Sequence, residues 1–300
     1  MAVASAFTWF PPELVVDDNR FVVHAGYTML LLRYVAHGGS TPHIATLCGP
    51  SGRNMLEDAP ADHAHHHGVW WGHGDVNGVD YYLELPGGEG PVDRGRIEHV
   101  AWSKILDDAP RFGFVEELEW RDHRDALVMG EQRSLNLTLG TEDHYTLDLR
   151  SVYTAERDLT FGDTKESVMP GIRPAEALTG LGGGTIVSSR GQTGEAATFG
   201  QPAEWVDVWG RRRSQYLGEE LTEGIACFDH PSNPGHPQRW FVRDYGPISP
   251  FEGHYFHEDR ALGAGGGLSL RHRIVVHVGD PGTADVESLY QAYCEEDSDE

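Results

Sequence analysis

The run His144-Tyr145-Thr146-Leu147-Asp148-Leu149-Arg150-Ser151-Val152-Tyr153 alternates apolar and polar side chains over most of its length. A period of two residues is typical of a β-strand with one face in the core and one in water. Residues 269–278 begin with the same alternation and end apolar. Short runs with high strand propensity recur between turn residues, and they predict strands over 20–25, 27–35, 43–48, 79–85, 96–102, 112–120, 126–139, 144–153, 223–229, 240–244 and 268–278.

Turn-forming residues separate these runs, since the chain holds 37 Gly and 17 Pro. One segment has helical spacing: Asp280 and Pro281 form a start signal, and Val286, Leu289 and Tyr293 follow. Strands and helices do not alternate as in a doubly wound fold. We therefore predict an all-β fold, a large antiparallel β-sandwich with a short C-terminal helix. We expect a single domain over 1–294, with the helix near 281–294, and an acidic tail over 295–300.

The 300 residues carry a net charge of -24, from 23 Lys and Arg against 47 Asp and Glu. This charge disfavours nucleic acid as a partner, because phosphates would be repelled. No stretch approaches the roughly 18 apolar residues of a membrane span, and residues 1–9 lack the regions of a signal peptide. We therefore expect no membrane partner and a cytoplasmic location. Cys48, Cys227 and Cys294 are widely spaced, which fits reduced thiols in that compartment.

Five of the 17 histidines fall within 11 residues, from His63 to His73. Histidine suits acid/base catalysis near neutral pH and is a common zinc ligand. His63 and His65 would share one face of a strand, and His66 would point the other way. The first two can hold a divalent metal, with His73 or Asp75 as a third ligand. An acid/base or substrate-binding role, a metal site and a loop of packing imidazoles all stay open at this point.

A second cluster lies on a proline-rich loop that follows a predicted strand. This loop carries His230, Asn233 and His236, and the chain returns through Trp240 and Arg243. Loops on a rigid scaffold are where binding residues usually lie, but a rigid turn with structural salt bridges explains the same residues.

A third cluster combines Glu166, a candidate base, with Arg173, a candidate clamp for a hydroxyl or carboxylate. Trp70 and Trp71 are either core residues or the wall of a sugar site, because an aromatic face stacks on the C–H face of a sugar ring.

Together these clusters resemble the bacterial PmoA-family proteins. The motifs are His63-Ala64-His65-His66-His67-Gly68-Val69-Trp70-Trp71-Gly72-His73-Gly74-Asp75-Val76-Asn77-Gly78, Phe161-Gly162-Asp163-Thr164-Lys165-Glu166 and Asp229-His230-Pro231-Ser232-Asn233-Pro234, and the resemblance spans about residues 15 to 280. It implies a fold similar to the galactose-mutarotase superfamily, a large antiparallel supersandwich that works on carbohydrates. The family's label of methane oxygenase does not fit a chain without hydrophobic spans. Members often accompany sugar dehydrogenases, which implies an oxidised keto sugar as substrate.

We predict a carbohydrate-active enzyme, a lyase or isomerase, that moves protons on a sugar or keto sugar, nucleosides and glycosides included. A base removes a proton next to a carbonyl, and the enolate is either reprotonated, which is epimerisation, or expels a β-leaving group, which is elimination. The alternatives are a mutarotase like aldose 1-epimerase, a non-catalytic carbohydrate-binding sandwich and a metal-dependent, cupin-like enzyme.

The predicted partner is a small sugar or sugar derivative, and the protein would work beside a sugar dehydrogenase. No cofactor is predicted with certainty, and a divalent metal stays open. The candidate catalytic residues are His66, His73, Glu166 and His230; the candidate substrate-binding residues are Trp71, Asp75, Asn77, Arg173, Asn233, Trp240 and Arg243; the candidate metal ligands are His63 and His65.

Overall fold

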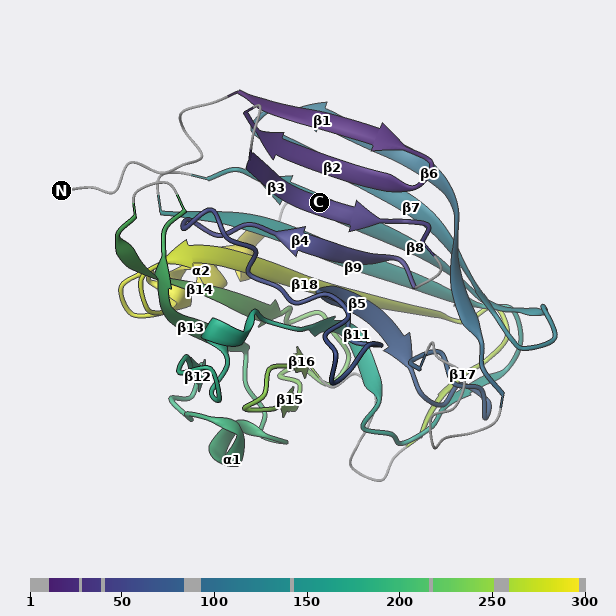
Figure 1. Ribbon diagram of the computed structural model, residues 1–300. Coiled ribbons are helices and arrows are strands. Elements are labelled where there is room, and N and C mark those ends of the chain that lie inside the picture. Colours follow the sequence, from purple (N-terminus) through teal and green to yellow (C-terminus); the bar gives the residue numbers. More distant parts are fainter. Residues whose placement is uncertain are drawn as a thin grey trace.

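The computed structural model describes residues 11–26, 29–38, 41–83, 93–140, 143–215, 218–250 and 259–296 (Figure 1). Regular structure is almost entirely antiparallel strand, in two sheets of eight strands and a separate pair, β10 (Leu159–Phe161) with β17 (Arg260–Leu262). The predicted all-β fold class is therefore confirmed. Within the described ranges, no helix has the length and apolar character that a membrane crossing requires.

The first sheet has the strand order β1-β2-β3-β4-β5-β11-β16-β15. Its first five strands follow one another along the chain, and β11 then adds to β5. Every residue of β5 and β11 is buried, so both faces of the sheet are covered there. The bounds are β1 (Pro12–Asp17), β2 (Arg20–Ala25), β3 (Met29–Val35), β4 (His43–Leu47), β5 (Val69–His73), β11 (Ser167–Ile172), β16 (Ile248–Pro250) and β15 (Trp240–Val242).

The second sheet has the order β12-β13-β14-β18-β9-β8-β7-β6 and contains the longest strands. The central strand β9 alternates buried and more exposed residues along its length, as its sequence predicts. The bounds are β12 (Thr185–Ser188), β13 (Trp205–Arg213), β14 (Glu220–Asp229), β18 (Gly267–Val278), β9 (His144–Ala155), β8 (Leu127–Thr138), β7 (Arg111–Arg121) and β6 (Arg96–Asp108).

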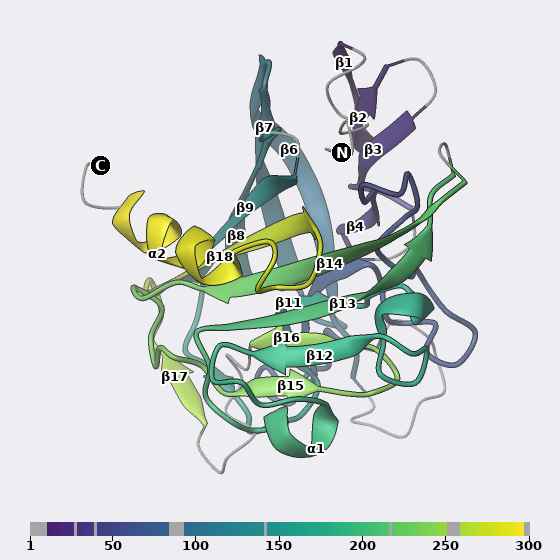
Figure 2. The same ribbon diagram turned by 90° about the vertical axis from the view of Figure 1, so that its left-hand side faces the viewer.

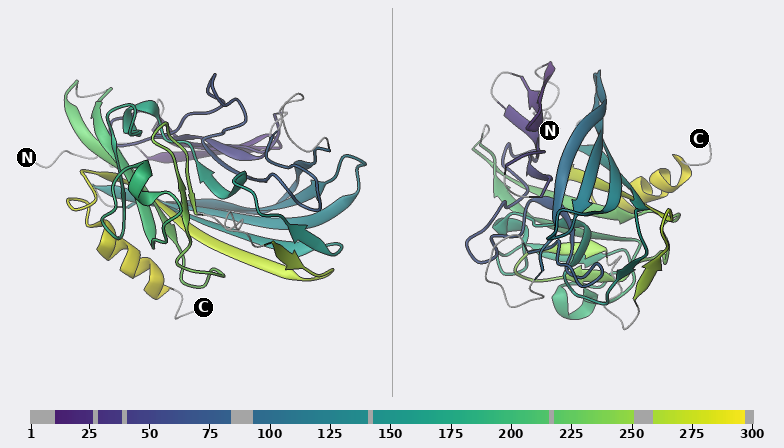
Figure 3. Two further views of the ribbon diagram at one scale, coloured as in Figure 1. Left: turned by 90° about the horizontal axis from the view of Figure 1, so that it is seen from below. Right: turned by 90° about the vertical axis from the view of Figure 1, so that its right-hand side faces the viewer.

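The two sheets face each other across one large apolar core (Figure 2). Strands β1 to β4 form one layer and β6 to β9 the other, and the right-hand view of Figure 3 shows the two layers nearly edge-on. Phe21 on β2 packs against Phe114 on β7 with ring centroids 5.1 Å apart. Trp120 and Tyr153 extend the same core.

A fully buried ionic network lies inside this core. Arg133 donates to Glu131 at 2.8 Å, and neither side chain is exposed. The guanidinium also donates to Tyr34 Oη, whose hydroxyl bonds Glu116. Its carbon lies 3.8 Å from the centre of the Trp71 ring. The Arg133 charge offsets the buried carboxylates. Because Tyr34 lies on β3 of the first sheet and Arg133 on β8 of the second, the network also links the two sheets.

The C-terminal helix α2 (Val286–Glu295) packs on the outer face of the second sheet. It begins at Val286, five residues later than the predicted start near Pro281. The Asp280 carboxylate accepts the Thr283 N–H at 2.8 Å, so it caps a turn that precedes the helix. The other helices are short: the 3-10 helix η1 (Glu176–Leu178) and α1 (Glu195–Thr198).

Most predicted strands are confirmed within a few residues, but the strand over 79–85 is wrong as far as the structure describes it. The Asp80 carboxylate accepts the N–H groups of Tyr82 and Leu83, at 2.7 and 3.0 Å. These amides are therefore committed to a turn and cannot join a strand ladder. Residues 84 and 85, like residues 27 and 28 of another predicted strand, lie outside the described ranges. The single-domain organisation over 1–294 stays a prediction, as does the acidic tail, of which 297–300 lie outside those ranges.

Candidate functional site

The histidine segment lies in the connection between β4 and β5, on the outer face of the first sheet. Along β5, Trp71 points into the core between the sheets, whereas Trp70 points outward and packs with Tyr82 and Val168. Trp70 is only 1% exposed because this connection covers it. The candidate site is therefore built above Trp70.

Four rings stack one upon another at this place. His66 lies on Trp70 with ring centroids 5.1 Å apart, and His63 lies on His66 at 4.6 Å. Tyr245, from the loop after β15, covers the other side of His63 at 5.0 Å, with the two planes only 10° apart. His65 meets His66 edge-on at 4.5 Å. We call these rings, with Tyr82, Asp62 and Arg173, the histidine cluster.

Arg173 directly follows β11 and holds this cluster together with a side chain that is 4% exposed. Its Nη1 lies 3.3 Å from His66 Nδ1, and its Nη2 donates to Asp62 at 3.2 Å. Its Nε donates to Glu57 at 3.3 Å, and its guanidinium carbon lies 5.1 Å from the centre of the Tyr245 ring. All three nitrogens are thus engaged, two with the cluster and one with Glu57, which makes Arg173 a positioning residue.

Asp62 fixes the tautomer of His63. The Asp62 carboxylate accepts a hydrogen bond from His63 Nδ1 at 2.9 Å. This bond, together with the positive charge of Arg173, lowers the pKa of Asp62 to about 2 against the opposing effect of partial burial. An ionised carboxylate can only accept, so Nδ1 of a neutral His63 carries the hydrogen and Nε2 carries the lone pair. The His63 side chain is 34% exposed and forms the accessible edge of the stack.

Arg173 fixes the tautomer of His66 in the opposite sense. A guanidinium can only donate, so His66 Nδ1 accepts, and its Nε2–H donates to Tyr82 Oη at 2.9 Å. Burial lowers the pKa of His66 to about 2, helped by the charges of His65, His63 and Arg173. Burial also raises the pKa of Tyr82, so the phenol keeps its hydrogen at neutral pH. Because Tyr82 Oη accepts from His66, this hydrogen remains to be donated.

Glu166 and Arg243 border the cluster. The Glu166 carboxylate acts electrostatically on Tyr82, and the Arg243 guanidinium acts on Tyr245. Glu166 accepts a hydrogen bond from Thr164 Oγ1 at 2.8 Å, and its side chain is 38% exposed. Arg243 pairs with Glu195 at 2.6 Å. Their catalytic and binding roles stay predictions.

Two predicted site residues on β5 face away from the cluster. Trp71 is 1% exposed and belongs to the core under Arg133. His73 shares its face, two residues along, and packs edge-on against Phe161 with centroids 5.3 Å apart. Its Nδ1 accepts the N–H of Asp75 at 3.1 Å. The sheet therefore lies between His66 and His73.

Asp75 and Asn77 shape the turn that follows β5. Asp75 accepts the Gly78 N–H at 2.8 Å. Asn77 donates to the Asp158 carbonyl at 3.0 Å and accepts the Thr160 N–H at 2.8 Å. These bonds anchor the turn to the start of β10, and a substrate-binding role for either residue stays a prediction.

His230 belongs to the second sheet. It follows β14 directly and packs edge-on against Tyr293 of α2, with ring centroids 4.9 Å apart. Its Nδ1 lies 2.7 Å from Ser232 Oγ. The candidate catalytic residues His66 and His230 thus lie on the outer faces of two different sheets, and their catalytic roles stay predictions.

The rest of the proline-rich loop is organised by Asp229, which is fully buried. Its carboxylate accepts from the Asn233 amide at 2.8 Å, from His236 Nδ1 at 2.8 Å and from the Gln238 N–H at 2.9 Å. Asn233 also accepts the Arg271 N–H and donates to the Arg271 carbonyl. Trp240 is 0% exposed and donates to the Ala203 carbonyl. In the described structure Asn233 and Trp240 thus serve the framework of the loop.

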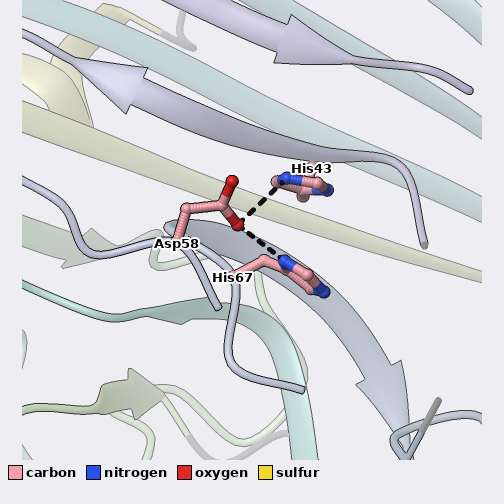
Figure 4. Close-up of side chains that lie close together, drawn as sticks. All are labelled: His43, Asp58 and His67. Atoms are coloured by element: carbon pink, nitrogen blue, oxygen red, sulfur yellow. Dashed lines mark hydrogen bonds and ion pairs between the residues drawn. The ribbon is translucent and has the colours of Figure 1, made fainter. Parts of the chain in front are cut away.

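A second group consists of two imidazoles and a carboxylate, and Figure 4 shows it. His43, at the start of β4, and His67 both approach Oδ1 of Asp58, at 3.3 and 2.7 Å. Among the described residues, these three offer ligand atoms that all lie within 4.8 Å of one another. Burial opposes ionisation of Asp58, but the hydrogen bonding and charge of the two imidazoles hold its pKa well below the ordinary value. His63 and His65, the predicted metal ligands, have ring centroids 5.8 Å apart.

The sequence did not point to several residues of these groups. Tyr82 and Tyr245 reach the cluster from turns well removed from His66 in sequence. His43 sits inside an apolar strand pattern, and Asp58 in a stretch without periodicity. For the group of His43, Asp58 and His67, the sequence offered one signal, the carboxylate of Asp58 nine residues before His67.

These observations define an antiparallel β-sandwich protein with a histidine- and tyrosine-rich site on one outer sheet face. Residues 22–291 match the model of a family of unknown function, DUF6807, and the chain therefore belongs to that family. No curated protein matches the sequence. The family match does not carry the PmoA label, and that part of the resemblance stays a prediction.

Several solved structures share features of the fold. The heparan sulfate lyase HepC from Pedobacter heparinus is 7% identical, with a TM-score of 0.45, over 90% of this chain but only 37% of its own. A galactose mutarotase related enzyme from Lactobacillus acidophilus is 10% identical, with a TM-score of 0.33, over 89% of this chain and 97% of its own. A GalM/aldose epimerase homologue from C. elegans is 11% identical, with a TM-score of 0.35, over 90% and 99%. At these values the likenesses carry no argument about what the site does.

Proposed function

We propose that the protein is a carbohydrate-active enzyme that moves a proton on a sugar or keto sugar at the histidine cluster. The observation that carries this proposal is the set of hydrogen bonds that assigns the tautomers of His63 and His66. His63, oriented by Asp62, presents Nε2 as a lone-pair nitrogen, and Tyr82, oriented by His66, keeps a phenol hydrogen to donate. A base and an acid held in one cluster are the minimum that proton abstraction and return require.

The proposed reaction takes place next to a carbonyl. His63 Nε2 removes a proton from the carbon beside the carbonyl, and the C–H electron pair forms an enolate. In elimination the enolate re-forms the carbonyl and expels the β-oxygen substituent, which takes a proton from Tyr82. In epimerisation Tyr82 protonates the same carbon from the opposite face, and the proton held by His63 passes to water as the phenol takes a proton back from water. The Arg173 guanidinium contacts Asp62 and His66, which orient the two groups, and its charge favours negative charge that develops nearby.

A sugar substrate is supported by the aromatic character of the site and by the resemblance to a carbohydrate-active superfamily. Tyr245 is half-buried and ends the ring stack, so its edge and the exposed edge of His63 offer apolar contact beside polar groups. A keto sugar made by a sugar dehydrogenase is the preferred substrate class, because a carbonyl makes the neighbouring C–H acidic.

The test is turnover of a panel of keto glycosides and aldoses by wild type and by Asp62→Asn. Elimination from a keto glycoside is followed by the ultraviolet absorbance of the enone product, and mutarotation of an aldose by polarimetry. We expect enone formation by wild type and a loss on the order of 10- to 100-fold in Asp62→Asn, because the half-exposed Asp62 orients the base.

The control is His123→Gln, which alters a histidine that also faces an aspartate but does not belong to the cluster. Equal turnover by Asp62→Asn and His123→Gln would contradict the proposed base. Polarimetric activity without enone would favour a mutarotase. Saturable sugar binding with no turnover of any substrate would favour a non-catalytic binding sandwich.

A further inference from the structure

His43, Asp58 and His67 form a compact group that the proposed proton transfer does not use. The imidazoles of His43 and His67 stack with centroids 4.2 Å apart and planes 27° apart. Both rings direct a nitrogen at the same carboxylate oxygen of Asp58 (Figure 4). The His43 side chain is 4% exposed and that of His67 is 6% exposed, whereas Asp58 is 31% exposed and opens the group to solvent.

The hydrogen bonds of His43 leave its second nitrogen with an unusual neighbour. His43 Nδ1 lies 2.8 Å from the Thr41 carbonyl oxygen, which can only accept, so Nδ1 carries the hydrogen of the neutral ring. Nε2 then carries a lone pair, and it faces Asp58 Oδ1 at 3.3 Å. Within the described part of the chain, this contact is the one polar interaction recorded for the buried Nε2. Two lone pairs that face each other inside a protein repel, so a proton or a metal ion between them is favoured.

The spacing leaves room for a metal ion between the two atoms. A proton shared between an imidazolium and a carboxylate brings nitrogen and oxygen to about 2.7–2.9 Å. Two ligand atoms on one tetrahedral zinc ion, each about 2.1 Å from the metal, lie about 3.4 Å apart. The 3.3 Å between His43 Nε2 and Asp58 Oδ1 matches the second value. The 2.7 Å contact of His67 is a hydrogen bond, whose proton the metal would displace.

We propose that His43, Asp58 and His67 bind one divalent transition-metal ion of the zinc class. Two imidazoles and one carboxylate are the borderline donor set that zinc prefers, and the exposed side at Asp58 leaves a position for water. The hydrogen bond from His43 Nδ1 to the Thr41 carbonyl is the outer contact that metal-binding histidines typically make. The ion would fasten the connection that carries the histidine cluster to the start of β4.

The proposal does not depend on the proposed function, because its readout is metal binding. EDTA-treated full-length protein is titrated with ZnCl2 by calorimetry in two buffers of different ionisation enthalpy. We expect about one zinc per chain and release of about one proton, from His67. Asp58→Asn and His43→Gln should each weaken zinc binding on the order of 100-fold or more, since both remove a ligand. Asp58→Asn is the safer variant for folding because its side chain is partly exposed.

Two controls locate the site. His63→Gln and His123→Gln should bind zinc like wild type, because neither residue belongs to the group. The absence of saturable zinc binding by wild type would overturn the proposal. So would unchanged binding by folded Asp58→Asn, or binding lost in His63→Gln and kept in His43→Gln. A failure of zinc binding with keto-sugar turnover intact would separate this proposal from the proposed function.

Discussion

Replacing Tyr82 by phenylalanine tests the acid of the proposed mechanism, and the structure supplies a matched partner for the comparison. Tyr82 Oη lies 2.9 Å from His66 Nε2, and Tyr290 Oη lies 3.4 Å from His236 Nε2. Both tyrosines are buried, at 7% and 4% exposed. The two substitutions therefore remove the same group from the same kind of partner, one inside the histidine cluster and one on α2.

The expected loss of unfolding free energy is small beside the expected loss of turnover, so the two effects can be told apart. Tyr82→Phe leaves the buried Nε2–H of His66 without its acceptor, which costs about 1–3 kcal/mol of unfolding free energy. Tyr290→Phe breaks a longer and weaker bond and should cost less than about 1 kcal/mol. A domain with roughly 5–15 kcal/mol of stability stays folded in both cases. Loss of the acid, in contrast, should lower turnover about 10²- to 10⁴-fold, or about 3–5 kcal/mol of barrier.

The assay combines urea unfolding of each variant with enone formation from the keto glycoside that wild type turns over. Tyr82→Phe should lose far more activity than its loss of stability explains, and Tyr290→Phe should keep wild-type activity. Comparable turnover by the two folded variants would refute the assignment of Tyr82, and a structural role for its hydroxyl would then suffice.

Three further predictions concern the framework. Arg133→Met should lower the free energy of urea unfolding by about 3–5 kcal/mol, because it leaves Glu131 buried without its positively charged partner; an unchanged midpoint would contradict this. Burial disfavours the charged form of His277, but its contact with Asp207 at 2.9 Å prevails and raises the pKa of His277. The stabilisation from this pair should be full below about pH 6.5 and decline as pH rises through the raised pKa, and the unfolding profile of His277→Gln should lack that decline. Of the three free thiols, Cys294 should react first with iodoacetamide in the native protein, as followed by mass spectrometry, because Cys48 and Cys227 are buried and burial raises the pKa of Cys48 to about 12; early modification of Cys227 would count against the core described above.

The strands that the sequence predicted well are those with one buried face. β9 alternates along its whole length, so period-two patterning locates it within two residues. β5 and β11 are buried on both faces and have no alternation, and the sequence did not indicate them. The turn at Asp80 was mistaken for a strand because its residues are apolar and aromatic, while its side-chain hydrogen bonds leave no trace in hydropathy.

The candidate site, too, was predictable from the sequence only in part. His63, His65 and His66 are close in sequence, and Arg173 carries an obvious charge, so local composition was enough to single them out. Which histidines share a face was not predictable, because the irregular connection before β5 sets the directions of His66 and His67. Contacts such as Arg173 with His66, separated by 107 residues, follow only from the order of strands in the first sheet.

The central claim is that His63, held by Asp62, removes a proton from carbon next to a carbonyl. The most direct measurement is deuterium incorporation from D2O into a panel of keto sugars and keto glycosides, followed by NMR with wild type and with His63→Gln. We predict exchange at the carbon beside the carbonyl in wild type, and exchange at least about 100-fold slower in the folded variant. Equal exchange by the two proteins, or none by wild type with sugars that it demonstrably binds, would contradict the account.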